Sequence, residues 1–238
     1  MRLAELLQVK PGVTAVTGSG GKTSLIEFLA KELAGDGTVL VATTTKIWPP
    51  AFCPVLTGAS TEDVREALRK SPVVCVGEPV TFTGPDGRTE TKFSAPRIPI
   101  ADLSKEAVYI LIEADGAKRK PLKAHALYEP VIPEEAGTVI QVVGTGGIGR
   151  PVSEAVHRPE LFLELLGDPA VVPETIVTPE AVAAVLLKEI RGDVLFLNQT
   201  DTEEDRGAAR RLAGYVKEAG YRAIVAGSLQ QRRFECLY

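Results

Sequence analysis

The feature that most constrains this chain is a glycine-rich segment, Thr17-Gly-Ser-Gly-Gly-Lys-Thr-Ser24. Residues 13–16 before it are apolar or β-branched, as in a strand buried on both faces. After it, apolar residues recur at helical spacing up to Gly35. Consecutive glycines let backbone amides turn around phosphate oxygens, and the positive end of the following helix faces the same point. The order strand, glycine loop, helix therefore predicts a phosphate-binding loop.

Each residue of this loop has an expected role in binding a purine nucleoside triphosphate. Lys22 would reach the β- and γ-phosphates as a catalytic cation, and the Thr23 hydroxyl would ligate Mg²⁺. The pattern G-x-x-x-x-G-K-[ST] would place its first glycine at position 16, where this chain has Val16. A similar loop with a displaced first glycine occurs in the Mur ligases of cell-wall synthesis. The alternative is a flexible turn between strand and helix. The residues expected to bind phosphate are Gly18, Ser19, Gly20, Gly21, Lys22, Thr23 and Ser24.

Short buried strands alternate with helices along the rest of the chain. We expect strands at residues 39–42, 73–76, 108–112, 138–143, 194–197 and 223–226, and helices at 3–9, 61–70, 178–188 and 202–219. This alternation predicts an α/β, P-loop NTPase-like fold, with a mostly parallel sheet covered by helices on both faces. Residues 80–93 alternate around a Gly-Pro-Asp-Gly turn at 84–87 and predict a β-hairpin. We expect one domain over 1–238, with the hairpin as an insertion at 77–100.

Two carboxylates follow the most apolar strand. Glu113 and Asp115 share one face of an extended chain, and a carboxylate at this place can hold Mg²⁺ while another orients the attacking water. We assign Asp115 with Thr23 to the metal and Glu113 to the water, although the sequence leaves this division open. Thr45, in the Thr-Thr-Thr run after the second strand, is a further candidate metal ligand, or an ordinary strand-ending residue.

The segment Asn198-Gln-Thr-Asp201 resembles the N-K-x-D element of GTP-binding proteins. There the aspartate accepts hydrogen bonds from the guanine ring, which adenine cannot donate. Gln199 replaces the usual lysine, so GTP is favoured over ATP without excluding ATP. The alternative is that Asp201 with Glu204 caps a helix. We expect Asn198, Asp201 and Ser228 to lie around the base, with the loop at Ser228 supplying a backbone contact.

Three other signals are weaker. The run Gly144-Thr-Gly-Gly-Ile-Gly149 matches a dinucleotide fingerprint, but Pro151 follows and the acidic ribose partner is missing, so we expect a mobile loop near the site. The basic run 118–123 predicts either a second anion site or a solvated loop. His157-Arg158 precedes Pro159 and is typical of a helix start, with substrate contact as the alternative.

Composition limits the classes of partner. The net charge of −4 gives no basic field for nucleic acid or for an anionic membrane. No apolar run approaches the ~18 residues of a membrane helix, and no signal peptide is recognised. Three widely spaced cysteines predict neither a zinc site nor a disulfide framework, and we expect them to be buried or half-buried thiols. We therefore expect a cytoplasmic protein.

A wider set of motifs resembles one family, the accessory proteins of selenium-dependent molybdenum hydroxylases of the YqeC type. The motifs are the loop at 17–23, Thr43-Thr-Thr-Lys-Ile47, Glu113-Ala-Asp-Gly-Ala-Lys118, Pro121-Leu-Lys-Ala124, Glu129-Pro-Val-Ile-Pro133 and Val156-His-Arg-Pro-Glu160. The resemblance implies a P-loop nucleotide-binding protein that acts in the maturation of a molybdenum hydroxylase, with that enzyme or its cofactor as partner. It does not imply a particular reaction.

Three functions follow from these residues. The first is a Mg²⁺-dependent hydrolase of GTP or ATP, in which Lys22, Glu113 and Asp115 act on the phosphates. The second is a kinase or a Mur-like ligase with a small acceptor bound by Lys118, Arg119, Lys123 or His157. The third is a nucleotide-binding chaperone without catalysis.

Overall fold

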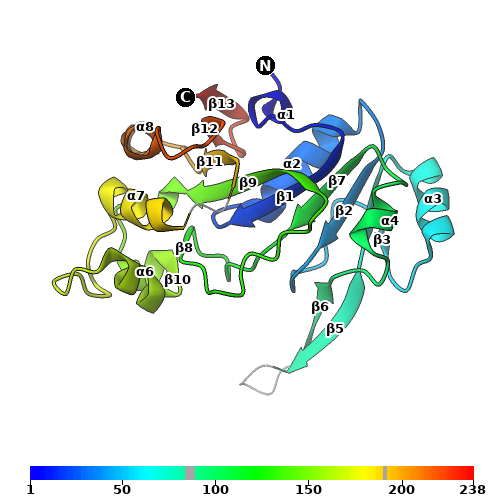
Figure 1. Ribbon diagram of the computed structural model, residues 1–238, viewed down its shortest axis with the longest axis horizontal. Coiled ribbons are helices and arrows are strands. Elements are labelled where there is room, and N and C mark those ends of the chain that lie inside the picture. Colours follow the sequence, from blue (N-terminus) through cyan, green and yellow to red (C-terminus); the bar gives the residue numbers. More distant parts are fainter. Residues whose placement is uncertain (84–88, 190–191) are drawn as a thin grey trace.

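The largest sheet has nine strands in the order β13-β12-β11-β9-β1-β7-β2-β4-β3, parallel except for β13 (Figure 1). The structure is a computed structural model, and it describes residues 1–83, 89–189 and 192–238. The expected P-loop NTPase-like α/β fold with a mostly parallel sheet is confirmed. The strands are β1 Gly12–Gly18, β2 Val39–Thr43, β3 Val55–Leu56, β4 Val73–Val76, β7 Tyr109–Glu113, β9 Ala136–Gly144, β11 Val194–Asn198, β12 Ala223–Ser228 and β13 Arg233–Cys236.

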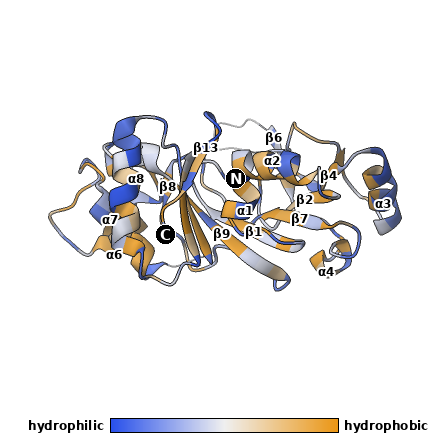
Figure 2. Ribbon diagram, turned by 90° about the horizontal axis from the view of Figure 1, so that it is seen from above, coloured by the Kyte–Doolittle hydropathy of each residue, from blue (hydrophilic) through white to orange (hydrophobic). Residues whose placement is uncertain are grey.

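Helices cover both faces because successive strand residues point to opposite sides. On one face, α1 (Leu3–Leu6) and α2 (Lys22–Leu33) pack on residues such as Val16, Leu111 and Val142. On the other face, α3 (Thr61–Lys70) and α4 (Ile100–Leu103) cover the β4 side, and α6 (Pro159–Leu166), α7 (Pro179–Lys188) and α8 (Glu203–Val216) cover the β12 side. Figure 2 shows the hydrophobic strands enclosed between these two groups of helices.

Several predicted helix starts are confirmed. The Ser60 hydroxyl accepts from the Asp63 amide at the start of α3, and the Thr178 hydroxyl accepts from Ala181 at the start of α7. Arg158 precedes Pro159 at the start of α6. The alternative in which Asp201 and Glu204 cap α8 is wrong, because Thr202 and Asp205 form the capping box. Asp201 is therefore not the residue that begins this helix.

Other elements differ from the sequence expectations. The sheet ends on β13, an antiparallel strand that we did not predict, so residues 223–226 do not close it. The first helix stops at Leu6, three residues before the predicted end. Residues 145–147 form a buried 3₁₀ turn, η1 (Thr145–Gly147), and the packing of Thr145 does not support the expected mobile loop. Short strands β8 (Leu122–Lys123) and β10 (Val156–His157) pair with each other next to it. A single-turn helix, α5 (Val152–Ala155), precedes β10.

The predicted hairpin is present as the antiparallel pair β5 (Glu78–Thr83) and β6 (Thr89–Ser94), while its expected turn at 84–87 lies outside the described residues. Ile47, just after β2, bridges to Phe93 of β6, which fixes the hairpin beside the carboxyl end of β2. The expectation for the cysteines holds for Cys53 and Cys75, whereas Cys236 is exposed. Within the described ranges, none of the helices has the length and apolar character needed to cross a membrane.

Candidate functional site

The register of the sheet brings four predicted motifs to one edge. Val16 pairs with Glu113, Gly18 with Val142 and Asn198 with Gly144, so the segments that follow β1, β7, β9 and β11 leave the same carboxyl edge. Ligands of parallel α/β sheets collect at this edge. The strand order places β1 directly between β7 and β9, and the glycine loop therefore lies between the two carboxylates on one side and η1 on the other.

The glycine loop has a shape that only glycine permits. Gly20 and Gly21 have φ of +81° and +123°, in the region that side-chain-bearing residues avoid. A Cβ on Gly20 would overlap the backbone of Gly144, and one on Gly21 would overlap the Asn198 amide. The loop is thus pressed against the ends of β9 and β11, and its curvature is fixed by close backbone packing.

The loop amides divide into two groups. The Gly18 N–H donates to Asp115 Oδ2 at 2.9 Å, and the Ser19 N–H donates to the Val142 carbonyl at 2.9 Å. These two amides face the protein, which differs from our expectation that they turn toward phosphate. The amides from Gly20 to Thr23 have no protein acceptor among residues 1–83, 89–189 and 192–238. They are the donors that remain for an anion at the start of α2.

Lys22 lies folded back inside the loop. Its Nζ donates to the Gly18 carbonyl at 2.7 Å and lies 3.0 Å from Asp115 Oδ1 and 3.7 Å from Glu113 Oε1. The Asp115 Oδ1 contact lacks hydrogen-bond geometry, and in the described part of the chain this oxygen is the one buried side-chain polar atom without a hydrogen bond. Lys22 thus places one positive charge between the two carboxylates, at the centre of the loop.

The two carboxylates have different surroundings. Glu113 accepts a hydrogen bond from the exposed Thr23 hydroxyl at 2.8 Å, at the mouth of the loop. Burial raises the pKa of Glu113, and Lys22 and Thr23 oppose that rise. Alternation correctly placed both acids on one side of the chain, since both approach Lys22. Only Glu113, however, contacts the threonine that is the expected metal ligand.

Asp115 belongs to a buried network instead. It has no exposed surface, and its Oδ2 lies 3.1 Å from Lys123 Nζ and 3.0 Å from His125 Nε2. Burial opposes ionisation of Asp115, but Lys22, His125 and Lys123 together hold its pKa below the usual value. Burial also works against the charge of His125, yet its hydrogen bonds to two carboxylates raise its pKa. The Asp115 carboxylate therefore fixes the first residue of the loop from its buried side, by accepting the Gly18 N–H.

The network continues in two directions. His125 Nδ1 lies 3.2 Å from Glu189 Oε2, beyond the end of α7. Lys123 Nζ lies 2.7 Å from Glu129, which also pairs with Arg158 at the start of α6. Sequence reasoning missed His125, Glu129 and Glu189 as site residues. It treated Lys123 as a group for a second anion, whereas Lys123 is a buried partner of Asp115.

The Asn198–Asp201 motif lies on the other flank of the loop. Asn198 Nδ2 donates to the Gly20 carbonyl at 2.7 Å, so this residue holds the glycine loop. Asp201 Oδ1 accepts a hydrogen bond from the Ser228 hydroxyl, which brings together two residues predicted to contact a base. Thr145 donates to the Asn198 carbonyl at 2.9 Å, which supports the motif from η1.

A pocket of about 710 Å³ opens at this motif. Its lining includes Asn198, Asp201 and Ser228 together with Gly21 and Phe28. Oδ2 of Asp201 accepts no hydrogen bond from any residue in the described ranges, which leaves an acceptor in this pocket. The volume is in the range of ligand pockets, and it adjoins the start of α2.

A second pocket of about 1100 Å³ lies on the opposite flank. It is lined by the loop residues from Gly20 to Ser24, by Glu113, and by the segments near Lys46, Lys118 and His157. Thr45 is not part of this lining, although its neighbour Lys46 is. Thr43, which is buried, donates to the Glu113 carbonyl at 2.8 Å and fixes the end of β2 against β7. No group of three or more His, Cys, Asp or Glu suited to a metal occurs in the described residues.

Comparison with known proteins identifies the relatives of this chain. The family described as YqeC protein matches residues 14–160, which hold the glycine loop, both carboxylates and the Lys123–His125 segment. This chain belongs to the YqeC family. It is 35% identical over 173 residues to a protein of Escherichia coli (strain K12) described as "Uncharacterized protein YqeC". The match covers 67% of this chain and 62% of the relative's length. Asn198, Asp201, Glu189 and Ser228 follow the part that the family match covers.

Proposed function

We propose that this member of the YqeC family binds and hydrolyses a purine nucleoside triphosphate with Mg²⁺, and that it prefers GTP to ATP. One observation carries the proposal: the amides of Gly20 to Thr23, which have no acceptor in the described residues, the Lys22 ammonium and the Thr23–Glu113 pair converge at the start of one helix. Preorganised donors of this kind stabilise the charge of a transferring phosphoryl group. The pocket beside Asn198 and Asp201 has room for the nucleoside.

The contacts favour an exchange of the roles expected for the two acids. Thr23 and Glu113 would hold Mg²⁺, because the hydroxyl and carboxylate lie 2.8 Å apart at the open mouth of the loop. Both are oxygen donors, which this cation prefers, and when bound it would neutralise charge on the phosphate oxygens. Asp115 is the positioning residue, since its buried carboxylate binds the Gly18 amide and faces Lys123 and His125.

Guanine preference rests on Asp201. Its Oδ1 is bound by Ser228, and its Oδ2 is the acceptor that guanine N–H groups would satisfy. The helix-cap alternative is weakened because Thr202 and Asp205 cap α8. With adenine the same carboxylate oxygen would stay without a donor, which costs about 1–3 kcal/mol.

Phosphoryl transfer to an acceptor is the second candidate function. The pocket of about 1100 Å³ reaches Lys22 and Glu113 from the side opposite the nucleoside pocket, so an acceptor can approach the terminal phosphate there. In either case we propose that the reaction serves the maturation of a molybdenum hydroxylase, with that enzyme or its cofactor as partner. This biological role rests on the family resemblance alone.

The test is a titration of the purified protein with fluorescent GTP and ATP, with and without Mg²⁺, followed by a phosphate-release assay. We expect GTP to bind about fivefold or more tighter than ATP. Thr23→Val should remove the Mg²⁺ dependence, whereas Thr57→Val, at an exposed position outside both pockets, should not. Phosphate release that requires an added acceptor would favour transfer over hydrolysis. Absence of binding for both nucleotides would refute the proposal.

A further inference from the structure

The pocket of about 1100 Å³ that contacts Lys22 and Glu113 has a basic lining. Basic side chains outnumber acidic ones in its lining, although the whole chain carries a net charge of −4. Two of its acids are already paired with cations, Glu113 with Lys22, and Glu129 with Lys123 and Arg158. The pocket therefore offers a local positive field to a ligand.

Two exposed cations of this lining have no partner among the described residues. Lys46 and Lys118 are exposed, and neither makes an ion pair or side-chain hydrogen bond within the described residues. Lys118 and Arg119 are consecutive residues with φ of +46° and +60°. Such left-handed backbone is unfavourable for residues with side chains, and it persists mainly where function requires it. Here it places two basic side chains in the pocket wall.

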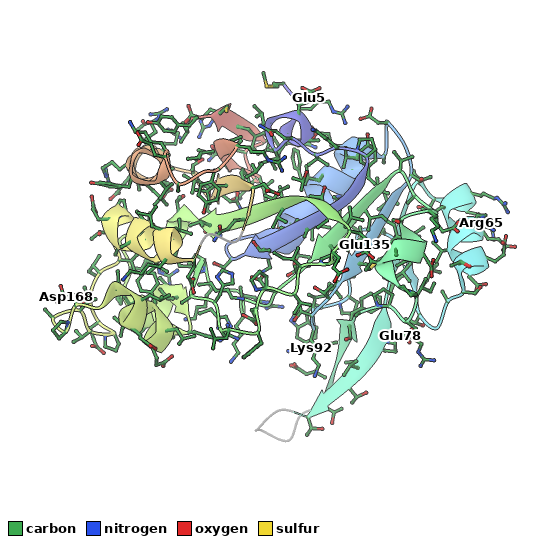
Figure 3. The ribbon with its side chains drawn as sticks, in the orientation of Figure 1. Glu5, Arg65, Glu78, Lys92, Glu135 and Asp168 are labelled. Carbon is green, nitrogen blue, oxygen red and sulfur yellow. The ribbon has the colours of Figure 1, made fainter. Side chains whose placement is uncertain are left out.

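Aromatic rings stand beside these cations. Trp48 is 45% exposed, and the Arg119 guanidinium lies 6.0 Å and the Lys92 ammonium 5.7 Å from its ring centroid. Figure 3 shows Lys92 at the base of the hairpin, near the end of β2. In the same lining, Arg158 lies 5.4 Å from the ring centroid of Tyr128. Cations held against exposed rings form surfaces on which a planar ring can stack.

We propose that this pocket binds a second small molecule, a phosphorylated compound with a planar aromatic ring, next to the terminal phosphate of the nucleotide. Its position rests on the proposed nucleotide site, because the two pockets share Gly21, Ser24, Arg119 and Gln199. Lys46 and Lys118 bind the phosphate group, and Trp48 stacks on the ring. His157 also lines this pocket, and burial, Arg158 and Lys123 lower its pKa to about 4. A bound anion would offset the positive charges beside this ring.

The experiment uses the full chain saturated with a non-hydrolysable GTP analogue. Riboflavin 5′-phosphate supplies ring and phosphate, riboflavin supplies the ring alone, and pyrophosphate supplies the anion alone. Trp48 is the one tryptophan of the chain, so its fluorescence reports on this pocket, and calorimetry gives the affinity. We expect riboflavin 5′-phosphate to bind about tenfold or more tighter than either partial probe.

Variants separate the contributions. Lys46→Gln with Lys118→Gln should weaken riboflavin 5′-phosphate about tenfold and leave the GTP analogue within about twofold. The matched control, Lys10→Gln with Lys217→Gln, removes the same charge at exposed positions outside this pocket and should change neither. Trp48→Leu should weaken riboflavin 5′-phosphate but not pyrophosphate.

Two results would overturn the proposal: riboflavin 5′-phosphate binding no tighter than the partial probes, or its displacement by the GTP analogue. Nucleotide binding would be intact in both, so the proposed function would survive them. Retained binding of riboflavin 5′-phosphate by a protein that binds no nucleotide would instead contradict the proposed function and support the second pocket.

Discussion

The contrast between Asp115 and Glu113 gives the sharpest test of the site. Asp115→Asn removes a negative charge that has no exposed surface and that faces Lys123 and His125, which are 8% and 7% exposed. Removing one partner of a buried ion pair costs roughly 3–5 kcal/mol. At about 2–4 °C per kcal/mol for a domain of this size, the unfolding midpoint should fall by roughly 6–20 °C.

Glu113→Gln is expected to behave in the opposite way. The amide oxygen can still accept from Thr23, and burial already disfavours the charge of Glu113, so stability should change by less than about 1 kcal/mol. Loss of the carboxylate beside Thr23 should lower Mg²⁺-dependent phosphate release by roughly 10²-fold or more. The assay is thermal unfolding at pH 7 without nucleotide, followed by phosphate release from GTP.

Asp102→Asn on α4 is the control, because Asp102 is half-buried in an outer helix and its ion pair to Lys105 lies outside both pockets. The pH matters for this comparison. The folded-state pKa of Asp115 is lowered, so its contribution is present above the unfolded value of 3.8 and is lost as the pH falls through the folded value. If Asp115→Asn kept the unfolding midpoint and only lost turnover, while Glu113→Gln unfolded, our division of roles would be wrong.

Three further predictions concern other parts of the site. Asp201→Asn should weaken GTP roughly 5- to 150-fold and improve xanthosine triphosphate, and equal loss of both would show that Asp201 does not contact the base. Gly20→Ala should lower nucleotide affinity more than about tenfold, because the new Cβ would overlap Gly144. Gly58→Ala is the control, since Gly58 also has a positive φ but has open space around it, and it should leave the affinity unchanged. Equal effects of the two substitutions would point to backbone strain alone. Histidine NMR should give a titration midpoint of about 4 for His157 and one above 6.5 for His125. The free energy of unfolding should then decrease through His157 as the pH falls from about 6.5 toward 4, and the stabilisation by His125 should be lost as the pH rises through its folded pKa. Two superimposed titrations near 6.5 would contradict the network.

Local sequence signals predicted the parts of the fold that depend on local physics. The glycine loop, the Ser60 cap and the Thr178-Pro179 start each rest on residues within one turn of each other, and the structure has them at the predicted places. The cap that we considered as an alternative for Asp201 lies one residue away from the real one, since both Asp201-x-x-Glu204 and Thr202-x-x-Asp205 satisfy the pattern. Only the backbone geometry distinguishes them.

The buried network was beyond sequence reasoning for a different reason. Glu189 is 64 residues from His125, and His125 is 10 residues from Asp115. None of these spacings matches a motif, and a lone histidine or a lysine in a basic run is usually solvated. Strand β13 was missed because it is short, Arg233–Cys236, and lies at the edge of the sheet, where it pairs with β12 alone.

The folded-back position of Lys22 bears on how fast a ligand is captured. Its ammonium already lies beside the acids behind the loop, and Gly20 and Gly21 are packed against Gly144 and Asn198, so backbone packing fixes the curvature of the loop. Capture then requires one side chain to swing outward and no segment to fold. Association should accordingly proceed in a single kinetic phase, with a rate proportional to ligand concentration.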